Sequence, residues 1–271
     1  MAMRIAVFAA MPQETGPIVR LDPGWHSIAS EPFPTSILRS PEREALLVQT
    51  GIGRSAAAQA ARQIAARGQA GPAMDLMLSV GFAGALSPDL TLGQLVFCSE
   101  LRVLDERSGI CAARYRCGRG TTRSTEASDF FIDHAVESAV FVTVDRLRSK
   151  AEIAPLVSHT RAVVEMESTA MADVAHELGI PFIGLRAISD EASFDIDLGL
   201  DSVMGKGGTI GLRELIPAVL FRPRLARSIP RLFRGSRLAG RNLAQMLASL
   251  LALPQQELLA LACPPRPVHR G

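Results

Sequence analysis

Four carboxylates stand where apolar runs of this chain end: Glu14, Glu165, Glu167 and Asp190. A carboxylate accepts two hydroxyl hydrogens at once, which suits a glutamate to the cis-diol of a sugar. An aspartate beside a purine ring could protonate the ring and draw electrons from its bond to the sugar, and a third carboxylate could activate water. Any one of these acids alone is typical of a solvated surface group or an ion pair, and Asp190 alone could cap a helix. Four carboxylates at one edge of a sheet favour a catalytic or binding site.

Seven continuously apolar runs predict the strands that would position these acids, because strands buried on both faces of a sheet lack alternating polar residues. Two intervening segments, 55–68 and 168–180, have helical patterns that begin with serine N-cap candidates and stop near glycines. This alternation predicts an α/β fold, a three-layer α/β/α sandwich around a mixed, twisted sheet. The predicted strands are 4–10, 45–51, 75–81, 94–101, 139–145, 162–167 and 182–189.

In sheets of this kind, ligands bind at the carboxyl ends of the strands. The glycine-containing stretch TGIGR (50–54) lacks the ending of a phosphate loop and the third glycine of a dinucleotide fingerprint, so a tight turn is favoured over a nucleotide-phosphate site. The stretch VGFAGAL (80–86) combines Phe82 with Ala83 and Gly84. Small residues there would let the backbone approach a flat ligand closely.

Composition limits the class of protein. The 271 residues are 48% hydrophobic, which is enough for a sizeable core. The four cysteines have no metal-ligand spacing with one another or with histidines, so we predict no metal site and no cofactor. Cys111 and Cys117 could pair, but free thiols are favoured. The N-terminus does not resemble a signal peptide and no run approaches the ~20 apolar residues of a membrane span, so we expect a cytoplasmic protein.

The C-terminal part of the chain is basic. From Thr209 to Gly271 it contains ten arginines against two glutamates, a net charge of +8; since the whole chain carries +2, the remaining 208 residues carry −6. We therefore divide the chain into a body, 1–208, and a basic amphipathic helical extension, 209–271. Prolines at 217, 223 and 230 are expected to divide the extension into short helices, and residues 104–126 are expected to form a long loop.

Two interpretations of the extension stay open. It could be a helical arm that packs on the body or on a dimer partner, or an element that contacts an anionic membrane surface, since basic amphipathic helices bind such surfaces. Nucleic-acid binding is disfavoured, because the segment lacks polar base-reading residues and interleaved aromatics.

Several stretches together resemble the nucleoside phosphorylase superfamily, and most of all its branch of 5′-methylthioadenosine/S-adenosylhomocysteine nucleosidases. The resemblance runs from residue 3 to about 192, in the right order and at the right spacing. The motifs that carry it are RIAVFAAMPQE (4–14), LLVQTGIGRSAAA (46–58), LMLSVGFAGALSPDLTLGQLV (76–96) and VEMESTAMADVAHELGIPFIGLRAISDEA (164–192).

The resemblance implies a small-molecule nucleoside substrate, a homodimer, and a role for each matched residue. Glu14 matches the carboxylate that activates water, and Arg186 the arginine that helps to hold the water and that carboxylate. Asp190 matches the acid that protonates an adenine leaving group, supported by Ser189. The ribose contacts match Met166 and Glu167, and Glu165, Phe82, Ala83, Gly84 and Leu147 complete the expected substrate-binding set.

The chain departs from the family pattern at two positions. Phe82 stands where the nucleosidases usually have serine, and Leu147 stands where an aromatic side chain stacks on adenine. Arg54 and Arg186 are the only basic residues in the matched loops, which favours water over phosphate as the nucleophile. The Arg/Leu-rich extension is similar to that of hopanoid-associated phosphorylase-like proteins, which are thought to remove adenine from adenosylhopane.

We therefore expect an enzyme that cleaves the N-glycosidic bond of an adenine nucleoside with water. The alternatives are a phosphate-dependent purine nucleoside phosphorylase, a nucleosidase acting on a lipid-linked nucleoside such as adenosylhopane, and a non-catalytic nucleoside-binding protein. The extension adds the alternative of a location on the surface of the inner membrane.

Overall fold

The computed structural model describes most of the chain. The described residues are 2–68, 74–105, 108–109, 111–117, 130, 133–146, 148–157, 160–194, 223–262 and 266–268. Leu147 lies outside this set, as does the segment 209–222 of the predicted extension. Among the described helices, none is long and apolar enough to cross a membrane.

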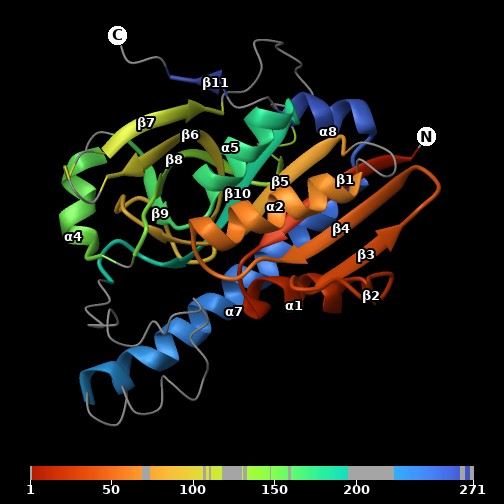
Figure 1. Ribbon diagram of the computed structural model, residues 1–271. Helices are drawn as coiled ribbons and strands as arrows, with labels where there is room; N and C mark the ends of the chain where they lie inside the picture. The colour runs from red at the N-terminus through yellow and green to blue at the C-terminus, as the bar shows by residue number, and fades with distance from the viewer. Residues whose placement is uncertain are drawn as a thin grey trace.

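One mixed sheet forms the centre of the described molecule (Figure 1). β1 is parallel to its neighbours β4 and β5, and β5 is parallel to β10 but antiparallel to β9. Because β10 also pairs with β6, the strands β5, β9, β8, β6 and β10 close into a ring. The strands are β1 (Met3–Ala9), β2 (His26–Ile28), β3 (Thr35–Arg39), β4 (Arg43–Gln49), β5 (Leu76–Ala85), β6 (Leu95–Leu104), β7 (Cys111–Arg116), β8 (Glu137–Thr143), β9 (Ala162–Glu165), β10 (Phe182–Asp190) and β11 (Arg266–Pro267).

The strand register brings the ends of two predicted motifs to the same place on β5. Gly84 is paired on one side with Val164, the first residue of the stretch VEME (164–167), and on the other side with Asp190, the last residue of the stretch RAISD (186–190). The pairing of β10 shifts by one residue between Ile188 and Asp190. Such an irregularity re-aims the side chains that follow it.

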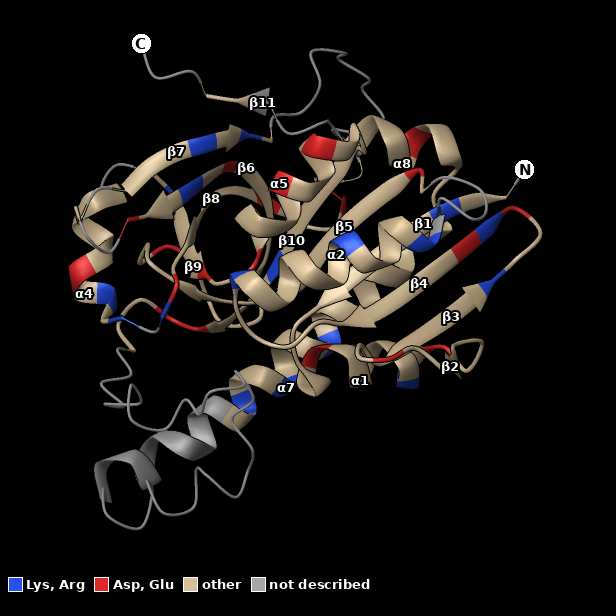
Figure 2. Ribbon diagram, in the orientation of Figure 1, with Lys and Arg blue, Asp and Glu red and all other residues tan. Residues whose placement is uncertain are grey.

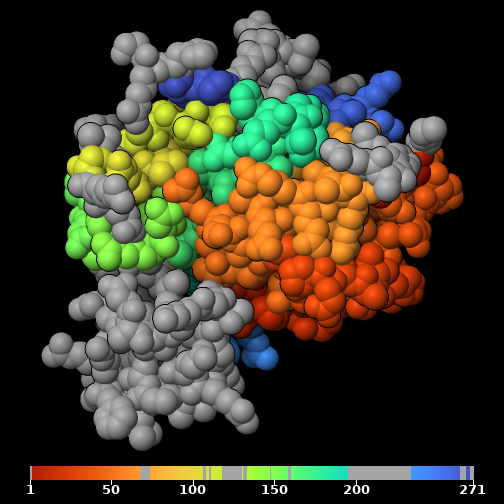
Figure 3. Space-filling view, in the orientation of Figure 1, coloured from red at the N-terminus to blue at the C-terminus, as the bar shows by residue number. Residues whose placement is uncertain are grey.

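Helices cover both faces of the sheet, which confirms the three-layer prediction. Helices α2 (Arg54–Gly68) and α5 (Ser168–Leu178) lie side by side on one face (Figures 1 and 3). Helix α1 (Pro12–Leu21) and helix α7 (Pro223–Ala252) cover the other. Alternate residues of β1 enter the two cores: Ala6 and Phe8 pack towards α2 and α5, Ile5 and Val7 towards α1 and α7.

The second half of α7 belongs to the core of the body. Leu243, Leu247 and Leu250 are at most 1% exposed and pack with residues of the sheet and of α1. Their spacing of three and four residues puts them on one helical face. Helix α8 (Gln255–Leu261) adds Leu258 to the same cluster. The described part of the predicted extension therefore packs on the body and contributes to its core.

Two sequence predictions about the connections are wrong in part. Residues 111–116 are not loop but strand β7, which pairs with β6 at the edge of the sheet. Since a strand of this length spans about 20 Å, Cys111 and Cys117 at its two ends are too far apart for a disulfide, and both are free. Pro230 does not end a helix, because α7 continues through it from Pro223 to Ala252. Its cost to the helix is offset by the packing of the buried half.

Both predicted serine caps are displaced by one or two positions. Helix α2 begins at Arg54, so Ser55 lies within its first turn. Helix α5 begins at Ser168, with Glu167 at the N-cap position. The Ser168 hydroxyl instead accepts a hydrogen bond from the guanidinium of Arg186 at 2.7 Å.

Candidate active site

Glu14 lies in the first turn of α1, where its carboxylate accepts three backbone hydrogen bonds. Its Oε2 accepts from the N–H groups of Ala10 and Met11, both at 2.8 Å, and its Oε1 from that of Phe82 at 2.7 Å. The residue is 3% exposed. Burial raises the pKa of Glu14 although these donors and the charge of Arg186 act to lower it. A positioned carboxylate with a raised pKa is suited to take a proton from water.

The end of β5 passes close to Glu14 at Gly81 and close to Asp190 at Gly84. A Cβ on Gly81 would lie 2.7 Å from Oε1 of Glu14, and a Cβ on Gly84 would lie 2.9 Å from Oδ2 of Asp190. Both approaches need a residue without a side chain. Three residues of strand span about 10 Å, so the two acids lie at opposite ends of a short stretch of backbone.

Glu165 and Arg186 form a buried ion pair that supports this stretch. Nη2 of Arg186 lies 2.8 Å from Oε2 of Glu165, and the two residues are 1% and 5% exposed. The other oxygen of Glu165 accepts from the hydroxyl of Thr143, and Oε2 also accepts from the N–H groups of Glu167 and Ser168. Glu165 thus holds the backbone of Glu167 and Ser168 in place, and its contact with substrate stays a prediction.

Arg186 is engaged on its two terminal nitrogens. Nη1 donates to the carbonyl oxygens of Ser79 and Leu185, and Nη2 to Ser79 and Ser168 hydroxyls as well as to Glu165. Its Nε is buried and has no hydrogen-bond partner among the described residues. A buried N–H without a partner is costly, so this donor is available to a ligand atom.

Glu167 directly precedes α5 and faces the turn before α2. Its Oε1 accepts from the N–H of Gly53 at 2.8 Å, and the residue is 8% exposed. Burial raises the pKa of Glu167 to about 8; the negative charge of Glu165 and, more weakly, that of Glu14 add to the rise, against the charge of Arg186. Glu167 lies three residues after Val164, which pairs with Gly84 of β5, so it follows a strand that is paired with the end of β5.

Asp190 ends β10 with both carboxylate oxygens in contact with donors. The hydroxyl of Ser189 donates to Oδ1 at 2.6 Å, and Oδ2 forms an ion pair with Nζ of Lys150. Ser189 also points towards the carbonyl of Ala83, with 3.4 Å between the oxygens. Lys150 begins helix α4 (Lys150–Ile153), which is followed by the short helix η1 (Ala154–Val157).

The remaining predicted contacts are mostly packing residues. Met166 is 8% exposed and packs with apolar residues of β8, including Val142. The ring of Phe82 packs on the α7 side of the sheet, since a Cβ on Gly240 of α7 would lie 3.5 Å from its tip. Phe82 thus reaches Glu14 through its backbone, which is independent of its side chain. Among the described residues, no group of acids, histidines and cysteines could hold a metal ion.

The sequence profile of the phosphorylase superfamily matches residues 4–205. The chain belongs to this superfamily. The matched range contains every acid of the site, together with β5 and Lys150, while α7 lies beyond it.

Relatives of this superfamily chain include curated nucleosidases. The 5′-methylthioadenosine/S-adenosylhomocysteine nucleosidase of Shewanella halifaxensis is 26% identical over 227 residues, which cover 76% of this chain and 94% of the relative. The enzyme of the same description from Shewanella sp. strain MR-7 is 25% identical over 224 residues, covering 76% of this chain and 92% of the relative.

Solved structures share the fold of this superfamily chain. A nucleosidase of that description from Colwellia psychrerythraea, in complex with adenine, has a TM-score of 0.66 at 20% identity and covers 97% of each chain. Futalosine hydrolase of Helicobacter pylori has a TM-score of 0.66 at 19% identity, covering 93% of this chain and 98% of its own.

Sequence reasoning missed Lys150 and Thr143 in this superfamily site. Thr143 ends β8 and was identified only as part of an apolar run, but its hydroxyl links Glu165 to Thr169 of α5. Lys150 lies outside the matched motifs, and its contact with Asp190 joins residues 40 positions apart. A lysine at the start of a short helical pattern gives no signal of that contact.

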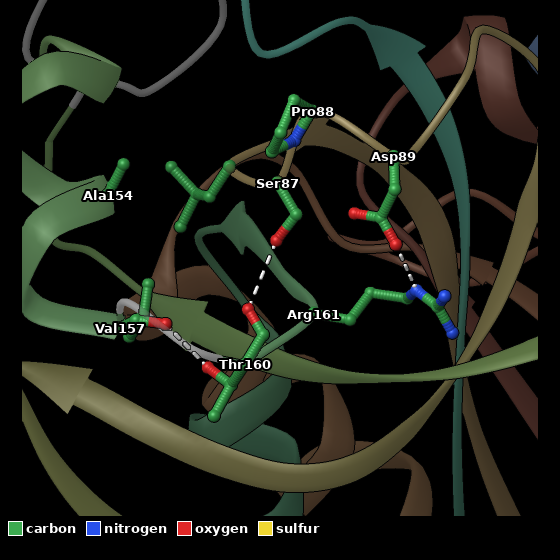
Figure 4. Close-up of a pocket in the computed structure, with 8 residues that line it drawn as sticks. Ser87, Pro88, Asp89, Ala154, Val157, Thr160 and Arg161 are labelled. Carbon is green, nitrogen blue, oxygen red and sulfur yellow. Dashed lines mark hydrogen bonds and ion pairs between the residues drawn. The ribbon is translucent and has the colours of Figure 1, made fainter.

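A separate cavity of about 490 Å³ lies beyond the end of β5 (Figure 4). Its polar groups are satisfied within the protein: Arg161 pairs with Asp89 at 2.8 Å, and the Ser87 hydroxyl donates to the carbonyl of Thr160 at 3.1 Å. None of the acids described above lines it. The cavity is therefore not part of the candidate active site.

Proposed function

We propose that this chain is an N-ribosyl hydrolase that releases adenine from a purine nucleoside carrying a bulky 5′ substituent. The observation that carries the proposal is that Glu14 and Asp190 both approach one short stretch of β5, while Glu167 follows β9, the strand that pairs with this stretch. The superfamily membership and the nucleosidase relatives support the same reaction.

The proposed reaction passes through a sugar cation. Glu14 takes a proton from water, whose oxygen attacks the anomeric carbon. Glu167 binds the ribose diol, and its negative charge stabilises the positive charge that develops on the sugar. The bond to the base breaks with both electrons going to the base, and the Asp190 end of the site supplies the proton that neutralises it.

Water is favoured over phosphate as the nucleophile because Arg54 and Arg186 are already paired with protein groups. The terminal nitrogens of Arg186 are already bonded to protein oxygens, and Arg54 pairs with Asp145 at 3.1 Å. A phosphate dianion needs several donors or a free cation. The one donor of Arg186 without a partner, Nε, is sufficient for a water molecule.

Base release tests the proposal. Purified protein is incubated with 5′-methylthioadenosine, S-adenosylhomocysteine, adenosine and inosine, each with and without inorganic phosphate, and free base and sugar product are quantified. Phosphate-independent formation of adenine and free ribose product is expected. Release that requires phosphate and yields a ribose 1-phosphate would replace the proposal with phosphorolysis, and a chain that binds but never cleaves would be a nucleoside-binding protein.

The finer proposal concerns α7 and the 5′ substituent. α7 exposes Phe233 (58%) and Leu238 (40%), and Arg234, Arg237 and Arg241 are exposed in the same part of the helix. Figure 2 shows basic residues on α7 below the sheet. A face with apolar and basic residues suits the surface of an anionic membrane. A cytoplasmic enzyme held at the inner membrane would have access to a lipid-linked nucleoside, as in hopanoid biosynthesis.

Vesicle binding tests the membrane contact. Because α7 also fills the core, truncating it would unfold the body, and substitutions are the sharper test. The combined variant Phe233→Ser, Arg234→Glu, Arg237→Glu should lose sedimentation with phosphatidylglycerol vesicles and keep its activity on soluble nucleosides. Arg39→Glu, at an exposed site on β3, is the control. Equal sedimentation of all three proteins would refute the contact.

The expected homodimer rests on the resemblance to the nucleosidases. Light scattering on the purified protein measures its mass directly. A mass of twice the 29.0 kDa of one chain is expected, and a mass of one chain would refute the dimer.

A further inference from the structure

Lys150 lies beside Asp190, at the end of the candidate site where the nucleobase is expected. Its Nζ pairs with Oδ2 of Asp190 and donates to the carbonyl oxygens of Asp190, at 3.2 Å, and Glu191, at 2.8 Å. The Lys150 side chain is 8% exposed and that of Asp190 14%. An ammonium group removed from water in this way requires a partner of opposite charge, and Asp190 provides it.

The contacts of Asp190 raise a chemical question. Its Oδ1 receives the hydroxyl hydrogen of Ser189 and its Oδ2 faces the ammonium of Lys150. A neighbouring ammonium group favours the ionised form of a carboxylate, and that form only accepts hydrogen bonds. In this arrangement the proton that a leaving purine needs is on the lysine, not on the aspartate.

From this geometry, and resting on the proposed function, we propose that Lys150 is a catalytic partner of Asp190 and the source of the proton for the leaving base. As the bond between the anomeric carbon and N9 breaks, its electron pair goes to the base. One proton passes from Nζ of Lys150 to Oδ2 of Asp190, and one from Asp190 to N7 of the base.

The proton given up by Lys150 is balanced by the proton that Glu14 takes from water. Water contributes a hydroxyl group to the anomeric carbon and a proton to Glu14. Lys150 is left as a neutral amine until it regains a proton from solvent, while Glu14 releases its proton. The net reaction is nucleoside plus water to base plus free sugar.

Gly84 shows that β5 leaves room for this pair. A Cβ at position 84 would lie 2.9 Å from both Oδ2 of Asp190 and Cε of Lys150, and 3.2 Å from its Nζ. No side chain fits at position 84 while the ion pair is in place. The same stretch of backbone that approaches Glu14 at Gly81 thus also accommodates the lysine–aspartate pair.

The competing interpretation is a structural role, in which Lys150 only fastens the start of α4 to the end of β10. Two substrates distinguish these roles. A purine needs a proton on N7 to leave as a neutral base, whereas the p-nitrophenolate of p-nitrophenyl riboside leaves without one. Loss of a proton source should affect only the purine, and loss of structure should affect both.

The experiment compares wild type, Lys150→Met and Lys150→Arg on an adenine nucleoside and on p-nitrophenyl riboside. Arginine keeps the positive charge but does not give up its proton in proteins. Both variants are expected to lose adenine release by about 100-fold or more, the usual effect of a general acid, with p-nitrophenyl riboside cleavage close to that of wild type. Arg148→Met, which removes a cation two residues before Lys150 that pairs with the exposed Glu152, is the control expected to retain both activities.

Three results would overturn the proposal. A parallel loss on both substrates in Lys150→Met and Lys150→Arg would mean a structural role. Full adenine release by Lys150→Arg would mean that the charge alone suffices, without proton transfer. Unchanged adenine release by Lys150→Met would exclude any role. Failure of the wild type on every nucleoside would instead refute the proposed function itself, and this result is read before any variant is compared.

Discussion

Nη2 of Arg186 lies 2.8 Å from Oε2 of Glu165, and both side chains are almost completely removed from solvent. Burial alone would raise the pKa of Glu165, but the charge of Arg186, with the donors Thr143 and Ser168, lowers it below its usual value. Glu165 therefore stays ionised and fixes the backbone that leads to Glu167.

Breaking this buried pair should destabilise the protein. Glu165→Gln leaves the guanidinium of Arg186 without a counter-charge, and one-sided removal of a buried pair costs about 3–5 kcal/mol. Urea denaturation measures the loss. Glu177→Gln is the control, because its partner Arg62 is 57% exposed and exposed pairs contribute about 0–1 kcal/mol. Equal stability of the two variants would contradict the positioning role of Glu165.

Activity should rise with pH through the titration of Glu167, whose pKa is raised to about 8. The value of kcat/KM reports ionisation in the free enzyme, and only ionised Glu167 places a negative charge beside the sugar cation. We expect kcat/KM to increase between about pH 6 and 9 in wild type and to lose most of that increase in Glu167→Gln. A flat wild-type profile would contradict the role of Glu167.

The same raised pKa has the opposite effect on stability. A carboxyl group whose pKa is higher in the folded than in the unfolded state stabilises the fold most at pH values below the unfolded pKa. This stability is lost as the pH rises through about 8. Denaturation midpoints should therefore fall from pH 5 to 9, less steeply in Glu167→Gln. Some slope should remain, because the pKa of Glu14 is also raised.

Gly235 of α7 should be needed for catalysis, although it lies far from the acids in the sequence. A Cβ there would lie 2.2 Å from the carbonyl oxygen of Ser189. Gly235→Ala is therefore expected to push apart α7 and the end of β10 that carries Asp190. A displacement of about 1 Å can cost ~100-fold in rate. Ser236→Ala, on the next residue of the helix, is the control, and equal adenine release by the two variants would refute the contact.

The buried half of α7 should contribute to stability as a core element does. Leu250 is fully buried, so Leu250→Ala is expected to cost about 2–5 kcal/mol of unfolding free energy. Leu238→Ala, at a position 40% exposed, should cost much less. Similar small losses of unfolding free energy in both variants would mean that α7 is a peripheral arm and not part of the core.

The sequence predicted the sheet well because its strands are buried on both faces and appear as unbroken apolar runs. β10, predicted as 182–189, extends from Phe182 to Asp190. Glu14, Glu167 and Asp190 could be identified because they stand where such runs end. Residue spacing could not distinguish the role of Glu165 from that of Glu167. The two lie two positions apart, and only the folded structure shows which partners each one contacts.

Other features depend on contacts that no local pattern encodes. The pair of Lys150 and Asp190 joins the short helix α4 to the end of β10, with three elements between them in the sequence. In α7, the prolines suggested short helices, but the apolar stripe from Ala239 to Leu250 is buried against the sheet and maintains one helix. Tertiary packing outweighed the local preference there.

Cleavage of 5′-methylthioadenosine in ¹⁸O-labelled water, without phosphate, tests the central claim most directly. Wild type and Asp190→Asn are followed by mass spectrometry of the sugar product and by adenine release. We predict ¹⁸O at the anomeric carbon of a free sugar for wild type, and a rate at least about 100-fold lower for Asp190→Asn. Adenine release that requires phosphate, or an Asp190→Asn variant as fast as wild type, would contradict the proposed hydrolysis and its acid.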